Sequence, residues 1–132
     1  MRFPRFVEAV SRRAELPTEQ AATIARATLQ TLAERVTGTE AADLAAQLPD
    51  ELSGYLTASG GGPRPTGGTV QFLRRVADRA AVDPAVAEVG VRAVLNTLRE
   101  TVTVGEFQDL VGQLPKGFDA MVDPIPRPPY AG

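Results

Sequence analysis

The chain has 132 residues, of which 43% are hydrophobic, and a formal net charge of −2, which together fit one folded domain with a core of its own. It contains neither cysteine nor histidine, so the sequence excludes disulfides, a thiolate nucleophile and every catalytic or metal site that depends on imidazole. We therefore predict a non-enzymatic protein with no catalytic residue, no cofactor and no metal ligand set.

The sequence offers no segment suited to a membrane. Its apolar stretches are short and interrupted by charges, and the first eight residues carry Arg2, Arg5 and Glu8 in place of the apolar run of a signal peptide. A cytoplasmic protein is therefore expected. A pI of about 5.2 gives no general attraction to phosphate backbones or anionic lipids, so neither nucleic acid nor membrane is an expected partner.

The sequence repeats itself at an offset of 66 residues. From Phe6 to Leu56 the register holds without a gap over 51 positions, and 19 of these positions are identical in the two copies. Duplication explains this agreement better than chance. A lone unit of this size buries too little surface to be stable, so we expect the copies to pack together. The fold class is predicted as all-α, with two tandem repeats of three to four helices each, related by a pseudo-two-fold axis and packed as one bundle.

Two helices open each unit. The first is expected over residues 4–14, where Phe6, Val10 and Ala14 share one face, and its copy repeats this spacing. The second and longest is expected over residues 18–36, and over 84–102 in the copy, with an apolar stripe wide enough to face a core. Asp83 before Pro84 predicts an N-cap with proline at the first helical position. We expect these long helices to form the centre of the bundle.

A third helix follows in each unit. Thr37 to Glu40 and Thr103 to Glu106 have the spacing of a capping box. In this motif the threonine hydroxyl accepts a hydrogen bond from the glutamate amide, and the glutamate carboxylate accepts one from the threonine amide. The helix is expected to reach Leu48 and Leu114. The prolines that follow end it and can open a short fourth helix, at 50–56 and 116–122.

These elements define the predicted organisation of the chain. A single helical domain covers 1–122, composed of repeat one (4–56), a Gly/Pro linker (57–68) and repeat two (69–122). The proline-rich tail over 123–132 cannot be helical and is expected to be extended or disordered.

A pattern shared by the two copies runs from Phe6 to about Val122 and depends on the residues Leu29, Leu32, Glu34, Glu40, Asp43, Leu44, Gln47, Leu48 and Pro49, with their partners in the second copy. This pattern resembles a bacterial family, the domain of unknown function 2267 (DUF2267). The resemblance implies an all-helical soluble domain and brings no activity, cofactor or catalytic residue. The long linker and the proline-rich tail depart from the family pattern.

Polar residues that both copies retain are the candidates for a functional site. They are Arg13, Arg79, Arg26, Arg92, Asp43, Asp109, Gln47 and Gln113. On the third helix, Glu40, Asp43 and Gln47 share a face, which suits a divalent cation or acid–base chemistry. We favour a structural interpretation, in which the glutamates belong to capping boxes and the aspartates lie near a helix start, where the macrodipole favours negative charge.

The retained arginines also allow two interpretations. The favoured one is a fixed structural partner, either a carboxylate across a helix interface, such as Asp43 for Arg13, or a helix C-terminus. The other is an anion-binding pocket that Arg26 and Arg92 build across the axis. A basic patch of Arg74, Arg75 and Arg79, with Arg12 and Arg13 in the first copy, is interpreted as a solvated face, because acidic residues dilute it.

Two hypotheses for the function follow. The leading one is a helical protein-interaction or adaptor domain, whose partner is another protein or a second copy of the chain. The alternative is a domain that binds a small ligand, an anion or a divalent metal through the duplicated polar residues.

Overall fold

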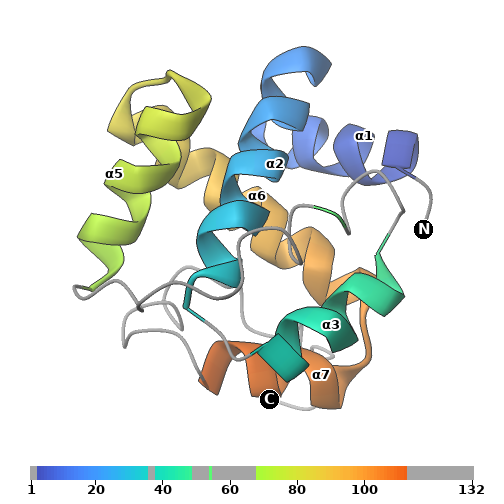
Figure 1. The fold of residues 1–132 in the computed structure, drawn as a ribbon. Coiled ribbons are helices and arrows are strands. Elements are labelled where there is room, and N and C mark those ends of the chain that lie inside the picture. The colour runs from blue at the N-terminus through green and yellow to red at the C-terminus, as the bar shows by residue number, and fades with distance from the viewer. Residues whose placement is uncertain (1–2, 36–37, 49–53, 55–67, 113–132) are drawn as a thin grey trace, which may run out of the picture.

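The computed structural model describes residues 3–35, 38–48, 54 and 68–112 of the chain (Figure 1). Within these residues the chain folds into helices without strands: α1 (Phe3–Ala14), α2 (Thr18–Ala33), α3 (Gly38–Gln47), α5 (Thr69–Ala80), α6 (Pro84–Thr101) and α7 (Val104–Gly112). The predicted all-α bundle is confirmed. The expected fourth helices except Gly54, all of the linker except Gly68, and the tail lie outside the described residues. Among the helices described, none is long and apolar enough to cross a membrane.

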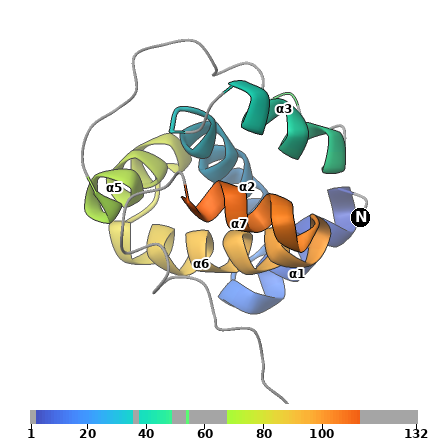
Figure 2. The ribbon, with the colours of Figure 1, turned by 90° about the horizontal axis from the view of Figure 1, so that it is seen from below.

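The helices of the two predicted repeats are interleaved (Figures 1 and 2). α2 and α6 cross at the centre, and α1 and α5 each contact both of them. α3 and α7 lie against each other at one end of the bundle, in front of the others in Figure 2. The first helix of each repeat therefore packs on the second helix of the other repeat. Such reciprocal contacts are what a pseudo-two-fold axis requires, although the axis itself stays a prediction.

α1 and α5 end in the same way. Glu15 and Ala81, 66 residues apart, both have a φ of 56°, in the left-handed region. The next amide then turns back to a carbonyl five residues earlier: Leu16 donates to Ser11 (3.1 Å), and Val82 donates to Ala77 (3.0 Å). This geometry gives hydrogen-bond donors to carbonyl groups at the helix end that have none within the helix, and it redirects the chain into the next helix.

The observed starts and ends of the long helices agree closely with those predicted from the sequence, apart from two differences. α2 ends at Ala33, about three residues earlier than expected, because the Arg35 amide donates to the Leu32 carbonyl (2.9 Å) and tightens the last turn. Asp83 and Pro84 occupy the predicted N-cap and first helical positions of α6, but the Asp83 side chain makes no capping hydrogen bond.

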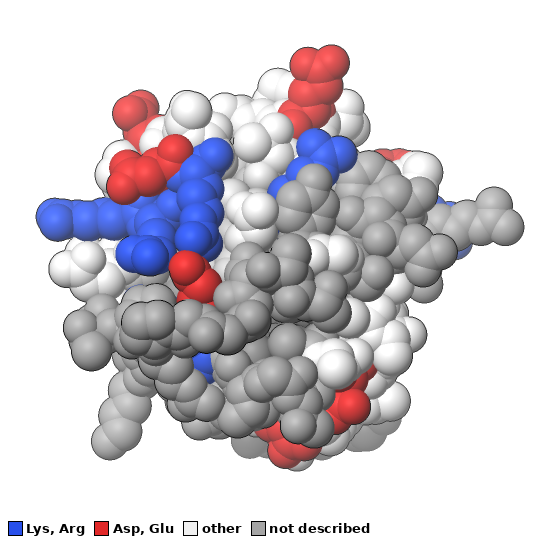
Figure 3. Space-filling view, in the orientation of Figure 1, with Lys and Arg blue, Asp and Glu red and all other residues white. Residues whose placement is uncertain are grey.

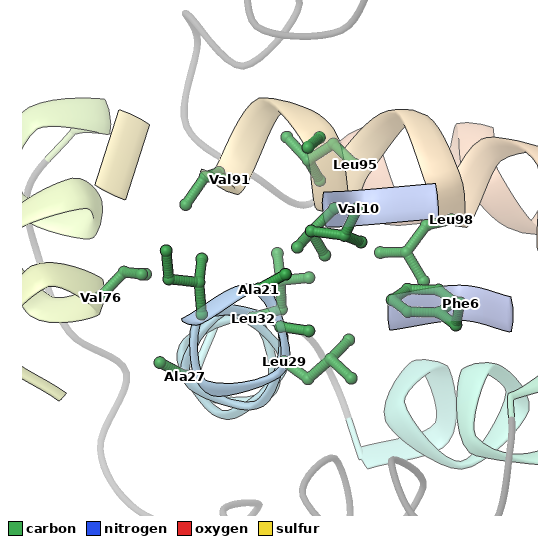
Figure 4. Close-up of a cluster of buried hydrophobic side chains, with 14 of the residues drawn as sticks. Phe6, Val10, Ala21, Ala27, Leu29, Leu32, Val76, Val91, Leu95 and Leu98 are labelled. Atoms are coloured by element: carbon green, nitrogen blue, oxygen red, sulfur yellow. The ribbon is translucent and has the colours of Figure 1, made fainter. Parts of the chain in front are cut away.

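The core is built around α2 and α6, as expected from their apolar stripes. Figure 4 shows α2 end-on, with Phe6 and Val10 of α1, Val76 of α5 and Leu95 of α6 arranged around it. These side chains are all fully buried. Each buried side chain of this size contributes about 1.5–3 kcal/mol, so this cluster supplies most of the stabilisation that positions the polar residues around it.

A close contact between the long helices joins Ile24 of α2 to Gly90 of α6, which are equivalent positions under the 66-residue offset. A Cβ atom on Gly90 would lie 2.5 Å from Ile24 Cγ2 and 3.0 Å from Ile24 Cδ1. Two large side chains therefore cannot occupy this crossing together. The fully buried Ile24 side chain fills the space that the glycine leaves. Its burial offsets the cost of about 1 kcal/mol for a glycine inside a helix.

Replacing Gly90 with alanine is expected to lower the free energy of unfolding by about 1–3 kcal/mol, because the added methyl group overlaps Ile24. In an uncrowded helix the same change would instead stabilise by up to about 1 kcal/mol. Urea denaturation followed by circular dichroism measures the difference.

The control is the double variant Ile24→Ala/Gly90→Ala. Removing the isoleucine branch makes room, so Gly90→Ala should cost less in the Ile24→Ala background than in the wild type. Strictly additive effects, or a stabilising Gly90→Ala, would show that the close crossing does not exist.

Candidate functional site

The retained arginine of repeat two lies where α5 packs on the last turns of α2. Arg79 Nη1 donates to Thr31 Oγ1 (2.9 Å), and Arg79 Nη2 donates to Glu34 Oε2 (2.8 Å). The Thr31 hydroxyl in turn donates to the Ala27 carbonyl one turn earlier (2.8 Å). The buried threonine hydroxyl thus both accepts and donates a hydrogen bond, and it orients the Arg79 guanidinium toward the Glu34 carboxylate.

The same arrangement recurs at the other side of the bundle, with every residue shifted by 66. Arg13 Nη1 donates to Thr97 Oγ1 (2.8 Å), and Arg13 Nη2 forms an ion pair with Glu100. The Thr97 hydroxyl donates to the Ala93 carbonyl (2.8 Å). Each arginine therefore joins the first helix of one repeat to the second helix of the other, in what we call the Arg–Thr–Glu link.

This link revises the sequence-based interpretation of the arginines. A carboxylate across a helix interface is indeed the partner of Arg13, but that carboxylate is Glu100. The named partner, Asp43, was wrong: it is exposed on α3, a helix that packs on α7. Thr31 and Thr97 were missed as members of the link. Their signal in the sequence was a threonine kept at the same position of the second helix in both copies.

The two links differ in their electrostatic environment. The Glu34 side chain is only 18% exposed and also accepts a hydrogen bond from Arg75 Nε (3.1 Å), whereas the Glu100 side chain is 50% exposed. Burial acts to raise the pKa of Glu34. The hydrogen bonds and charges of Arg79 and Arg75 outweigh it and hold the pKa of this carboxyl below its usual range.

A further arginine lies beside Glu34. Arg35 is 6% exposed, and its guanidinium stands over the ring of Phe72, 5.6 Å from the centroid. Burial lowers the pKa of Arg35, the charge of Arg75 lowers it further, and Glu34 opposes both. A guanidinium keeps its proton at neutral pH even so. Such groups bind carboxylates or phosphates and do not transfer protons.

We call this side of the molecule the arginine corner. In Figure 3 basic side chains gather over α5, at the left of the view, with acidic atoms above and below them. The arginine corner consists of Glu34, Arg35, Arg74, Arg75, Asp78 and Arg79.

The second pair of candidate arginines is less closely integrated. Arg92 pairs with Glu88 one turn earlier on α6 (3.5 Å), and both side chains are about half exposed. Arg92 also lines a shallow hollow of about 270 Å³ together with Arg13, Val89, Ala93 and Asn96. Arg26 is half-buried, has interactions of its own and does not line this hollow. The structure thus brings Arg92 to one hollow with Arg13, while an anion pocket between Arg26 and Arg92 stays a prediction.

The capping box at the start of α7 is only half formed. Thr103 Oγ1 accepts a hydrogen bond from the Glu106 amide (3.2 Å), as predicted. The Thr103 amide, however, donates to Gln47 Oε1 of α3 (2.9 Å). The predicted hydrogen bond from the Thr103 amide to the Glu106 carboxylate was therefore wrong. This amide can donate only one hydrogen bond, and the Gln47 side chain of the other repeat accepts it. Glu106 Oε1 is left buried without a hydrogen-bond partner among the described residues.

The remaining acidic candidates lie on the outer surface. Asp43 and Asp109 are exposed, and Asp109 has interactions of its own. Within the described part of the chain, no three acidic, histidine or cysteine side chains come together as a metal would need. Gln113 and the Glu40 side chain lie outside the described residues, as does the first-copy capping threonine. A metal site on this face therefore stays a prediction.

The model of a family described as "Uncharacterized conserved protein (DUF2267)" matches residues 3–121. A comparison with curated proteins gives no match.

The difference between the two links is testable by charge removal. At neutral pH, Glu34→Gln should destabilise the protein by about 1–2 kcal/mol, because two guanidiniums lose a partly buried carboxylate. Glu100→Gln, at the equivalent half-exposed position, should cost about 0.5 kcal/mol. Urea denaturation of both variants measures the costs, and equal costs would contradict the burial argument.

The same pair of variants also predicts a pH dependence. The pKa of Glu34 is lower in the folded than in the unfolded chain, so its contribution is complete above the unfolded pKa, near 4.3, and is lost as the pH falls through the folded value. The stability difference between wild type and Glu34→Gln should therefore shrink between about pH 5 and pH 3. A difference that stays constant over this range would refute the lowered pKa.

The contact between the third helices predicts a local effect. Gln47→Ala removes the acceptor of the Thr103 amide, which should cost about 1 kcal/mol and speed hydrogen exchange at the start of α7. Asp43→Ala, one turn earlier on α3 and exposed, is the matched control and should leave that exchange unchanged.

Proposed function

The chain belongs to the DUF2267 family, and we propose that it is a non-enzymatic helical domain that binds another protein. The observation that carries this proposal is the reciprocal Arg–Thr–Glu link. The polar residues kept in both repeats would be the first candidates for catalysis or ligand binding. Those of the link instead bind one another and hold the repeats together.

The chemistry of the remaining polar residues supports the same proposal. The chain has no histidine or cysteine, and its abundant arginines are permanent cations rather than acid–base catalysts. Fixed charges on the outside of a helical bundle suit recognition of a complementary protein surface. That the protein is not an enzyme remains part of the proposal.

One observation favours a second candidate function. The hollow lined by Arg13, Arg92 and Asn96 combines two guanidiniums and an amide, which could bind a small anion. Each of these arginines already has a carboxylate partner, Glu100 or Glu88, and these carboxylates compete with an incoming anion. Protein binding is therefore the better supported of the two.

The two candidates are separated by capture and thermal shift on the full chain. Proteins retained by the immobilised chain from its native cells should include one that binds the purified chain in calorimetry with a defined stoichiometry. Phosphate, sulfate, citrate, Mg²⁺, Ca²⁺, Mn²⁺ and Zn²⁺ should leave the melting temperature unchanged. A ligand at one hundred times its Kd would instead add about 2.7 kcal/mol and raise the melting temperature by several degrees.

Arg92→Gln is the control for the second candidate. An anion-dependent increase in melting temperature that this variant abolishes would favour the hollow as the functional site and contradict our proposal. Failure to find any protein that binds the purified chain would contradict it as well.

A further inference from the structure

The duplication supplies a reference for the arginine corner, because each of its positions has an equivalent 66 residues away. We call the equivalent set the reference corner: Glu8, Ala9, Arg12, Arg13, Glu100 and Thr101. Both corners contain one Arg–Thr–Glu link. The arginine corner has four arginines and two acidic residues, whereas the reference corner has two of each. One corner therefore has an excess of positive charge that the other lacks.

The excess charge is not needed to join the repeats. The reference corner is held by Arg13, Thr97 and Glu100, and the positions equivalent to Arg74, Arg75 and Arg35 are Glu8, Ala9 and Thr101. Like charges at close range repel, and the charge of Arg75 accordingly acts on Arg35 to lower its pKa. The fold accounts for Arg75 and Arg35, which contact Glu34 and Phe72 between α2 and α5. Arg74 takes part in neither contact, yet it adds positive charge at this corner of a chain whose net charge is −2.

Of the four arginines, Arg74 and Arg75 are also accessible, whereas Arg35 is buried. Arg74 and Arg75 are exposed on α5, and Val70, 62% exposed, precedes Arg74 by one helical turn on the same face. The basic surface over α5 in Figure 3 is this region. Arginine next to an exposed apolar side chain is a combination enriched in protein–protein interfaces.

We propose that the arginine corner is the surface through which this protein binds its partner, and that it takes an acidic segment of that partner containing an apolar residue. This inference rests on the proposed function. Guanidinium groups bind carboxylates in bidentate fashion, and Val70 offers a contact for the apolar residue. The mixture of charges at the arginine corner favours carboxylates in a peptide over a continuous phosphate backbone, because Glu34 at the end of α2 and Asp78 of α5 lie among the arginines and the whole chain is acidic.

The test is fluorescence anisotropy with a labelled peptide of about ten residues, composed of glutamates with two leucines, added to the full-length protein. Arg74→Glu should weaken binding about tenfold, which corresponds to about 1.4 kcal/mol. Arg12→Glu makes the same change of charge on an exposed position of the reference corner and should alter the affinity less than about twofold. Raising the salt concentration should weaken binding to the wild type.

Folding is checked separately. Arg74→Glu should melt close to the wild type, because Arg74 is exposed and takes no part in the Arg–Thr–Glu link. If it melts lower, Arg74→Gln, which removes the charge without reversing it, replaces it in the titration and should still weaken binding while Arg12→Gln does not.

Each of the following outcomes would overturn the inference. If Arg12→Glu weakens binding as much as Arg74→Glu, the effect is one of general charge. If a single-stranded oligonucleotide of similar length binds more tightly than the peptide, the corner binds nucleic acid. If a captured partner binds the wild type and Arg74→Glu equally, the proposed function stands and this surface is wrong. If no partner exists, the proposed function fails, and the corner has no partner to bind.

Discussion

The close crossing of α2 and α6 at Ile24 and Gly90 determines how near the two repeats can come. Because glycine has no side chain, the long helices approach until Ile24 contacts the α6 backbone, and the flanking helices then pack on both. At this approach the last turn of α1 reaches α6, and the last turn of α5 reaches α2. A wider crossing would separate Arg13 from Glu100 and Arg79 from Glu34. The apolar contact at the centre thus makes the polar links at the periphery possible.

Duplication constrains different parts of the bundle in different ways. Where the equivalent positions Ile24 and Gly90 meet each other, there is room for only one large side chain, and the copies differ. Where each residue meets a different residue of the other copy, the copies can stay alike, as Arg13 and Arg79 do. On the outer surface neither constraint applies. Charge there can diverge, as it has at the arginine corner, where Arg75 pairs with Glu34 and Arg35 stands over Phe72, while Arg74 takes part in neither contact.

The arrangement also bears on how such a domain could acquire a partner. Residues of the Arg–Thr–Glu links are committed to stability, and changing them would loosen the bundle. Exposed positions such as Arg74 lie on the same helix but outside the link, so they can change with little effect on folding. A rigid bundle that presents variable charges on one helix is well suited to recognition, because the recognising side chains are positioned at low entropic cost.

The sequence by itself determined the all-α class, the helix bounds to within a few residues, and the apolar faces that form the core, because these depend on local spacing and on residues at helix ends. Comparison of the copies also singled out Arg13 and Gln47 as polar residues retained in both, and predicted a fixed structural partner for the arginine. Only the tertiary structure decided their partners: Glu100 rather than Asp43 for the arginine, and the Thr103 amide for Gln47, where Glu106 had been expected. Spacing along a helix defines the face on which a side chain lies. Which distant residue faces it depends on how the helices cross.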